Sequence, residues 1–175
     1  MASTGKIRAV AAGLLVALVL VFGGVAAGLR FNGTHSFPLG FYFASHKHAG
    51  IGDLVFVATP DLPVFAMAKE RGYLDVAYSP TPHILKKLVA VSGDRVTITA
   101  AGVDVNGIRL VNSAPMDRDG AGRPLVPYPL KDYDLLPGEV LLMSDYNPAS
   151  FDARYFGPVR ATEIEAVVKP LLTWN

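Results

Sequence analysis

A run of 21 residues without a charged or strongly polar side chain, residues 9–29, constrains the fold more than any other feature. A helix of that length is about 30 Å long, which matches the hydrocarbon core of a bilayer. A secretory signal that is cleaved is the alternative, but its apolar region is typically about 7–15 residues long. Basic residues at Lys6 and Arg8 precede the run, and this bias favours a cytoplasmic N-terminus. We therefore expect three segments: a cytoplasmic tail (1–8), an inner-membrane anchor (9–29) and a periplasmic domain (30–175).

Composition excludes several classes of protein. The 175 residues suffice for one compact domain with an appendage, and no internal repeat is visible. The net charge of +1 provides no general attraction to nucleic acid. The chain has no cysteine, which excludes disulfides, thiol catalysis and thiolate metal sites. We expect neither a metal nor a cofactor.

A constrained turn follows the apolar run at residues 32–42, Asn-Gly-Thr-His-Ser-Phe-Pro-Leu-Gly-Phe-Tyr. Pro38 restricts Phe37 to extended conformations, and the two glycines allow backbone geometries that other residues resist. Ser36 can therefore present its hydroxyl and amide outward, although a plain surface turn is the alternative. Because the six residues from Arg30 to Ser36 span at most about 20 Å, the serine is expected close to the bilayer surface.

The remaining chain predicts many short strands and one short helix. Strands are expected at 52–57, 84–91, 95–99, 139–143 and 163–169, a hairpin at 103–110 around Asn106-Gly107, and a helix at 62–71. Residues 112–138 predict mostly a long surface loop, and Pro80 and Pro82 bound another loop. These elements predict a mainly β domain, either barrel-like or built of paired antiparallel sheets, with one N-terminal transmembrane helix.

Two lysines interrupt the apolar strand predicted at residues 84–91. Lys86 and Lys87 must point to opposite faces, so one can reach water while the other faces the interior. Burial lowers the pKa of a lysine, and the neutral amine can then take the proton of a serine hydroxyl. Periodicity does not decide which of the two is inside.

Histidine is the competing general base. His35 is adjacent to Ser36, and neighbouring side chains on an extended chain diverge. His46 and His48 lie in a polar loop, and a surface role is expected for each of the four histidines. His83 precedes the lysine strand, and a Ser-His-Asp triad that uses it remains an alternative without a motif. The spacing of the histidines suggests no metal site.

Four segments, in this order, resemble signature blocks of the type I signal peptidase family of membrane-anchored serine proteases. They are residues 36–38 (Ser-Phe-Pro), 52–55 (Gly-Asp-Leu-Val), 86–94 (Lys-Lys-Leu-Val-Ala-Val-Ser-Gly-Asp) and 150–159 (Ser-Phe-Asp-Ala-Arg-Tyr-Phe-Gly-Pro-Val). Taken by itself, the last segment could equally be a polar loop with an Asp152–Arg154 ion pair. The resemblance extends from residue 9 to the end and implies a mostly β fold with its groove near the membrane.

The resemblance implies that Ser36 is the nucleophile and Lys86 the general base. Thr34 and the amide of Ser36 would donate hydrogen bonds to the oxyanion. Ser150 matches the family serine that hydrogen-bonds the lysine amine. It also implies that a pair of charged residues buttresses the site, Asp152 and Arg154.

The sequence departs from the usual family pattern at two positions. Leader peptidases of general secretion usually carry methionine after the nucleophile, where this chain has Phe37, and Ser92 stands where proline is common. The pattern Ser36-x-Pro38-x-Gly40-x-Tyr42 resembles the TraF branch instead. Members of that branch mature the pilin precursor of conjugative plasmid transfer systems.

From the resemblance we expect a Ser/Lys peptidase that processes a membrane-associated pilin or preprotein. Its acyl-enzyme would be resolved by water or by the substrate's own N-terminal amine, which would give a cyclic pilin. The expected partners are this substrate, membrane lipid and mating-pair or type IV secretion components, but no nucleic acid. A general signal peptidase and a non-enzymatic, membrane-anchored envelope scaffold remain the alternatives.

Overall fold

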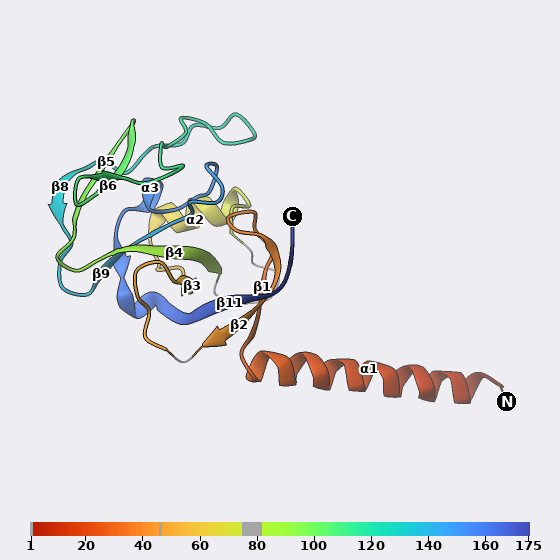
Figure 1. Cartoon of the computed structure of the whole chain (residues 1–175). Coiled ribbons are helices and arrows are strands. Elements are labelled where there is room, and N and C mark those ends of the chain that lie inside the picture. Colours follow the sequence, from red (N-terminus) through yellow and green to blue (C-terminus); the bar gives the residue numbers. More distant parts are fainter. Residues whose placement is uncertain (1, 46, 75–81) are drawn as a thin grey trace.

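The computed structural model describes residues 2–45, 47–74 and 82–175, with side chains at all of these positions except 2–4, 16–18, 20 and 21. Over these residues the chain forms a long N-terminal helix and a domain of two antiparallel sheets (Figure 1). The prediction of a mainly β domain is confirmed. The surface role predicted for His46 and the start of the loop at Pro80 lie outside the described residues.

The first helix, α1 (Ala2–Ala26), leads into strand β1 (Leu29–Asn32). It therefore begins inside the predicted cytoplasmic tail and ends before residue 29. Figure 1 shows it extending away from the β domain. A helix with the length and apolarity needed to cross a membrane is not found in the described part of the chain. The anchor at residues 9–29 stays a prediction.

The larger sheet has the strand order β1-β2-β11-β3-β4-β9-β10. Besides β1, its strands are β2 (Leu39–Ser45), β3 (Leu54–Ala58), β4 (His83–Val91), β9 (Glu139–Met143), β10 (Val159–Arg160) and β11 (Ile164–Trp174). The strand β4 lies between β3 and β9, where Val55 pairs with Lys86 and Lys87 pairs with Met143. Because side chains cover both faces at this point, consecutive residues of β4 are buried.

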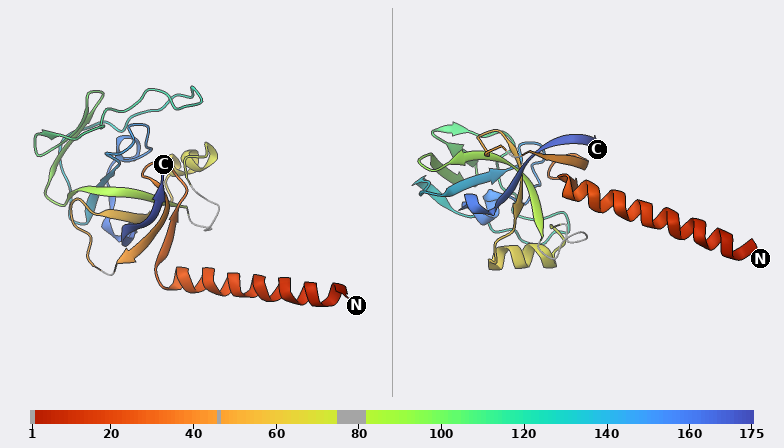
Figure 2. Two further views of the ribbon diagram at one scale, coloured as in Figure 1. Left: turned by 45° about the vertical axis from the view of Figure 1, so that its right-hand side comes forward. Right: turned by 90° about the horizontal axis from the view of Figure 1, so that it is seen from below.

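The smaller sheet has the order β7-β6-β5-β8 and lies at the end of the domain away from α1 (Figure 2). Its strands are β5 (Arg95–Thr99), β6 (Gly102–Val105), β7 (Ile108–Arg109) and β8 (Leu130–Asp134). Asn106 and Gly107 join β6 to β7 with φ angles of 52° and 80°, so the predicted Asn-Gly hairpin is confirmed.

Three short helical segments connect the strands: α2 (Pro63–Glu70), α3 (Ala153–Phe156) and the 3₁₀ turn η1 (Ala161–Glu163). Pro63 begins α2, where the fixed φ of proline suits the first helical turn, and the predicted helix is confirmed. Phe65 of α2 packs against Phe151 and Phe156, with ring centroids 6.2 and 4.9 Å apart. This aromatic contact anchors the segment that carries residues 150–154.

The loop predicted over most of residues 112–138 is confirmed, although β8 within this range pairs with β5. One sequence prediction was wrong. The last strand does not end before Pro170 but continues to Trp174. Beyond Val168 the strand pairs with β2 alone, and a register shift lies between Pro170 and Leu172. Proline is tolerated there because its missing N–H is not needed by a second neighbouring strand.

Candidate active site

Ser36 lies in the turn of a hairpin that the sequence did not predict. Strands β1 and β2 pair antiparallel, with Asn32 opposite Gly40, and the intervening residues form the turn. The serine is 8% exposed. Within the described part of the chain, no acceptor binds its backbone N–H. This amide is therefore available to a ligand.

A buried amide, Asn32, organises the turn from inside. Its Nδ2 donates to the carbonyl oxygens of Thr34, Phe37 and Pro38 at 2.9, 3.1 and 3.1 Å. Its Oδ1 accepts from the backbone N–H of Thr34 at 3.2 Å and from the Thr34 hydroxyl at 3.0 Å. One side chain thus fixes the backbone on both sides of Ser36.

Lys86 reaches this turn from the centre of the larger sheet. Its side chain is 1% exposed, and its Nζ lies 2.6 Å from Ser36 Oγ. The neighbouring Lys87 projects to the other side and pairs with Asp145. The structure therefore decides what periodicity left open, since Lys86 is the lysine that faces the interior.

Burial changes the acidity of this amine. Desolvation lowers the pKa of Lys86 from 10.5 to about 8. The charge of Asp152 acts in the opposite direction and that of Arg154 in the same direction as desolvation, so the two charges oppose each other. A substantial fraction of Lys86 is consequently neutral under mildly alkaline conditions, when its lone pair can accept the Ser36 proton.

Asp152 and Arg154 form a completely buried ion pair beside the lysine. Arg154 Nε and Nη2 donate to the two carboxylate oxygens of Asp152, each at 2.8 Å. The guanidinium also donates to the carbonyl oxygens of Pro148 at 2.6 Å and Ser150 at 3.0 Å. The pair therefore fixes the backbone around Ser150 and adds little net charge near Lys86.

Ser150 and Thr34 take positions that differ from the expected contacts. The Ser150 hydroxyl donates to Ser36 Oγ at 3.2 Å, whereas the family resemblance implied a bond to the lysine amine. The hydroxyl of Thr34 is engaged by Asn32. It would have to rotate before it could donate to an oxyanion beside the Ser36 amide.

Sequence reasoning missed three residues that hold the nucleophile turn: Asn32, Ser144 and Asn147. The Ser144 hydroxyl donates to the carbonyl oxygen of Ser36. Asn147 Nδ2 donates to the carbonyl oxygen of His35 at 2.9 Å. Both contacts join residues more than 100 positions apart, so no local pattern could have indicated them.

His83, the alternative general base, is paired with a residue other than Ser36. His83 Nε2 lies 2.8 Å from Glu165 Oε2, and its ring packs near Phe56. Ser36 Oγ is hydrogen-bonded instead to Lys86 and Ser150. Among the described residues, no group of His, Asp or Glu could hold a metal ion.

Two hollows adjoin the sheets. One, of about 310 Å³, is lined by Ser36 and by Tyr73, Met116, Leu125, Phe151 and Tyr155; we name it the Tyr73 hollow.

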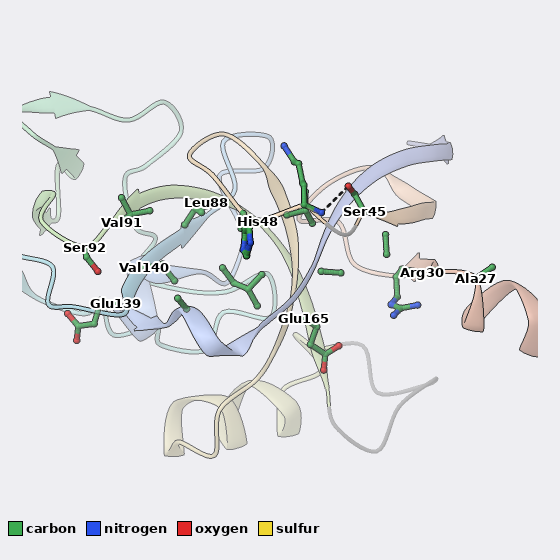
Figure 3. A pocket seen from close by; sticks show the side chains of 18 of the residues that line it. Ala27, Arg30, Ser45, His48, Leu88, Val91, Ser92, Glu139, Val140 and Glu165 are labelled. Carbon is green, nitrogen blue, oxygen red and sulfur yellow. Dashed lines mark hydrogen bonds between the residues drawn. The ribbon is translucent and has the colours of Figure 1, made fainter.

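The other hollow measures about 680 Å³, and none of the predicted site residues lines it (Figure 3). Its ionisable side chains are Arg30, Lys47, His48, Glu139 and Glu165, and several already have partners. Glu165 pairs with His83, and Lys47 with Asp53. Ser36 and Ser150 line the smaller hollow, so that hollow adjoins the candidate site.

Comparison with known proteins assigns the class. A family model described as signal peptidase, peptidase S26, matches residues 3–173, and the chain belongs to this family. It is accordingly a serine peptidase of the signal-peptidase type.

Two relatives are both plasmid transfer proteins TraF of Escherichia coli. One is 42% identical over 174 residues, which cover 96% of this chain and 98% of the relative. The other is 44% identical over 167 residues, which cover 94% of each chain. A crystal structure of a signal peptidase I from Enterococcus faecalis V583 aligns with a TM-score of 0.42 and 19% identity. It covers 71% of this chain and 100% of that one.

Proposed function

We propose that the chain is a membrane-anchored Ser/Lys peptidase that processes a pilin precursor during conjugative plasmid transfer. The observation that carries the catalytic part is the distance of 2.6 Å between Lys86 Nζ and Ser36 Oγ in a buried site. A lysine and a serine so placed form the nucleophile–base pair that peptide cleavage requires.

Acylation begins when neutral Lys86 takes the hydroxyl proton of Ser36 while the oxygen attacks the scissile carbonyl carbon. The negative charge that develops on the carbonyl oxygen is stabilised by the free N–H of Ser36, with the Thr34 hydroxyl as the second donor. As the C–N bond breaks, protonated Lys86 returns its proton to the leaving amine. The product is an ester between Ser36 and the acyl part of the substrate.

A second nucleophile then resolves the ester. Water attacks the ester carbonyl, Lys86 takes its proton, and Ser36 leaves with that proton restored. If the substrate's own N-terminal amine attacks instead, the same proton transfers give a cyclic peptide. The Asp152–Arg154 pair serves both routes by holding the loop that contains Ser150.

The open edge of β4 offers a place for the acyl part. Strand β9 ends at Met143, opposite Lys87, so the preceding residues of β4 pair with β3 only, within the described part of the chain. An extended substrate segment can add to such an edge through backbone hydrogen bonds. This position places the scissile bond beside Lys86.

The substrate and location are inferred from the relatives and from the sequence. The relatives are named plasmid transfer proteins, and the alignments cover nearly all of this chain. The uncharged residues 9–29, preceded by Lys6 and Arg8, favour an inner-membrane anchor with the domain in the periplasm. A substrate already in the membrane would then meet the site close to the bilayer.

The test follows pilin processing by mass spectrometry in cells that carry a conjugative plasmid. Ser36→Ala and Lys86→Met should abolish processing and plasmid transfer while the protein still accumulates. Lys87→Met is the matched control, because that side chain is half-buried and pairs with Asp145, and it should retain processing. Full processing with Lys86→Met would contradict the mechanism.

The alternatives give different results. A general signal peptidase would restore secretion to cells that lack their leader peptidase, whereas a dedicated pilin enzyme would not. An envelope scaffold would show no covalent labelling of Ser36 by an acylating probe. Topology is tested by a periplasm-dependent reporter fused after Arg30, which should be active.

A further inference from the structure

Four segments that are distant in the sequence bound the Tyr73 hollow, together with Tyr155. They are the turn at 33–36, Gly72 and Tyr73 just after α2, the loop at 116–125, and the segment 147–151. Hydrogen bonds tie the second and third of these together, because Arg71 Nη1 donates to Pro124 O at 2.7 Å and Arg123 Nη2 donates to Arg71 O at 3.2 Å. The hollow is therefore built into the fold beside the nucleophile and needs no closing motion.

Its lining combines aromatic and aliphatic side chains (Tyr73, Met116, Leu125, Ala149, Phe151 and Tyr155) with polar ones (Thr34, His35, Ser36, Asp119, Asn147 and Ser150). The rings of Tyr73 and Phe151 lie 5.4 Å apart, and those of Phe151 and Tyr155 stack at 5.8 Å. The Tyr155 hydroxyl accepts the backbone N–H of Met116 at 2.8 Å, so this polar atom is already engaged. Sites of this kind bind apolar side chains and orient them through ring faces.

The one carboxylate in the lining, Asp119, does not make the hollow a cation site. Its side chain is 7% exposed and accepts from the Tyr73 hydroxyl and from Arg123 Nε. It also accepts the backbone N–H groups of Ala121 and Arg123, at 2.9 and 2.8 Å. The Tyr73 hydroxyl, followed by the other donors, holds the pKa of Asp119 well below its usual range. With its charge paired and its oxygens engaged, this carboxylate has little to offer a substrate cation.

The position of the hollow indicates which part of the substrate it meets. The acyl part is assigned to the open edge of β4, and no residue of β4 lines the hollow. The hollow instead adjoins Ser36 on the side of Thr34 and Ser150. A peptide that passes over Ser36 from the β4 edge therefore enters the hollow with the residues that follow the scissile bond.

We propose that the Tyr73 hollow binds a large apolar or aromatic side chain within the first two residues after the scissile bond. This inference rests on the proposed peptidase function and adds a specificity subsite on the leaving side of the substrate. Tyr73, Met116 and Leu125 would make the contacts that select the side chain.

The experiment uses the full-length enzyme in mild detergent and a set of peptides. All of them have the same sequence before the scissile bond. The peptides carry Phe, Ala or Lys at the first or second position after the scissile bond. We expect kcat/KM to be at least about tenfold higher for Phe than for Ala at one of these positions, as for other apolar subsites. Covalent labelling of Ser36 by a small acylating probe counts the competent sites in every sample.

Two variants change the hollow, and one serves as control. Gly120 lines it, and a Cβ added there meets nothing within 4 Å, so Gly120→Leu inserts a side chain without strain. In this variant, kcat/KM for the Phe peptide divided by kcat/KM for the Ala peptide should be close to one. Met116→Ala, which removes part of an exposed wall, should lower the ratio several-fold. Ala121→Leu adds a similar bulk at a neighbouring exposed position outside the lining and should keep the wild-type ratio.

Equal cleavage of the Phe and Ala peptides by wild type, or preference for Lys, would overturn the subsite while leaving the peptidase assignment intact. An unchanged ratio in Gly120→Leu would overturn it as well. Failure of the probe to label Ser36 in wild type would instead overturn the proposed function itself. The two failures are therefore distinguishable.

Discussion

Replacing Lys86 with methionine should make the protein more stable at neutral pH and abolish its activity. The pKa of Lys86 falls from 10.5 to about 8 on burial, a shift of about 2.5 units. At 1.36 kcal/mol per unit, the buried amine costs about 3 kcal/mol of folding free energy at pH 7. Methionine has a similar length and carries no charge, but it loses the contact with Ser36, worth about 1 kcal/mol. The net gain for Lys86→Met is about 2 kcal/mol.

The pH dependence of this gain follows from the direction of the shift. Below pH 8 Lys86 is protonated in both folded and unfolded chains, so the burial cost is fully present. Between pH 8 and 10.5 the folded lysine is neutral while the unfolded one still binds a proton, so the stability of wild type rises relative to the variant. Above pH 10.5 the cost has vanished and only the lost contact remains.

The assay is denaturant unfolding of the full chain in mild detergent from pH 7 to pH 11, for wild type and Lys86→Met. The free-energy difference between them should change by about 3 kcal/mol across this range. Ser36→Ala is the control, because it keeps Lys86 buried and inactivates the enzyme. A difference between Lys86→Met and wild type that stays flat over this range would refute the argument that burial neutralises Lys86.

Three further substitutions probe the supporting structure. Asn32→Ala removes the hydrogen bonds that fix the turn around Ser36, so kcat should fall by about 100-fold with little change in KM. Unchanged kinetics would refute the positioning role of Asn32. Arg154→Met leaves the Asp152 carboxylate buried without its counter-charge and should cost about 3–5 kcal/mol in denaturant unfolding; a cost below about 1 kcal/mol would contradict the pairing. Gly40 has a φ of 131°, and Gly40→Ala places a Cβ 2.3 Å from the carbonyl oxygen of Leu172. The Tm should therefore drop by several degrees, and an unchanged Tm would show that this contact relaxes freely.

Much of the fold could be predicted because its patterns are local. The apolar run of β4, the strand at residues 139–143 and the Asn106-Gly107 turn are each specified by a few adjacent residues. The hairpin β1–β2 was missed because β1 has only four residues and follows directly on an apolar run. The extension of β11 past Pro170 depends on which edge of the strand is paired, which no single segment reveals.

The candidate site also has residues that local sequence motifs predict and residues that only the folded structure reveals. The identities of Ser36, Lys86 and the Asp152–Arg154 pair follow from motifs. The burial of Lys86 depends on side chains from distant parts of the chain, such as Ser36, Asp152 and Arg154, so its own strand pattern could not reveal it. Asn32 has a residue type common in turns, and only its contacts distinguish it from a surface residue.

The pH dependence of Ser36 acylation tests the central claim most directly. The rate of covalent labelling by an acylating probe is measured from pH 5 to pH 10 for wild type and Lys86→Met. If neutral Lys86 takes the Ser36 proton, the wild-type rate rises to a plateau with a midpoint near pH 8 and the variant is not labelled. A midpoint near 6.5, as a histidine base would give, or rapid labelling of Lys86→Met would contradict this mechanism.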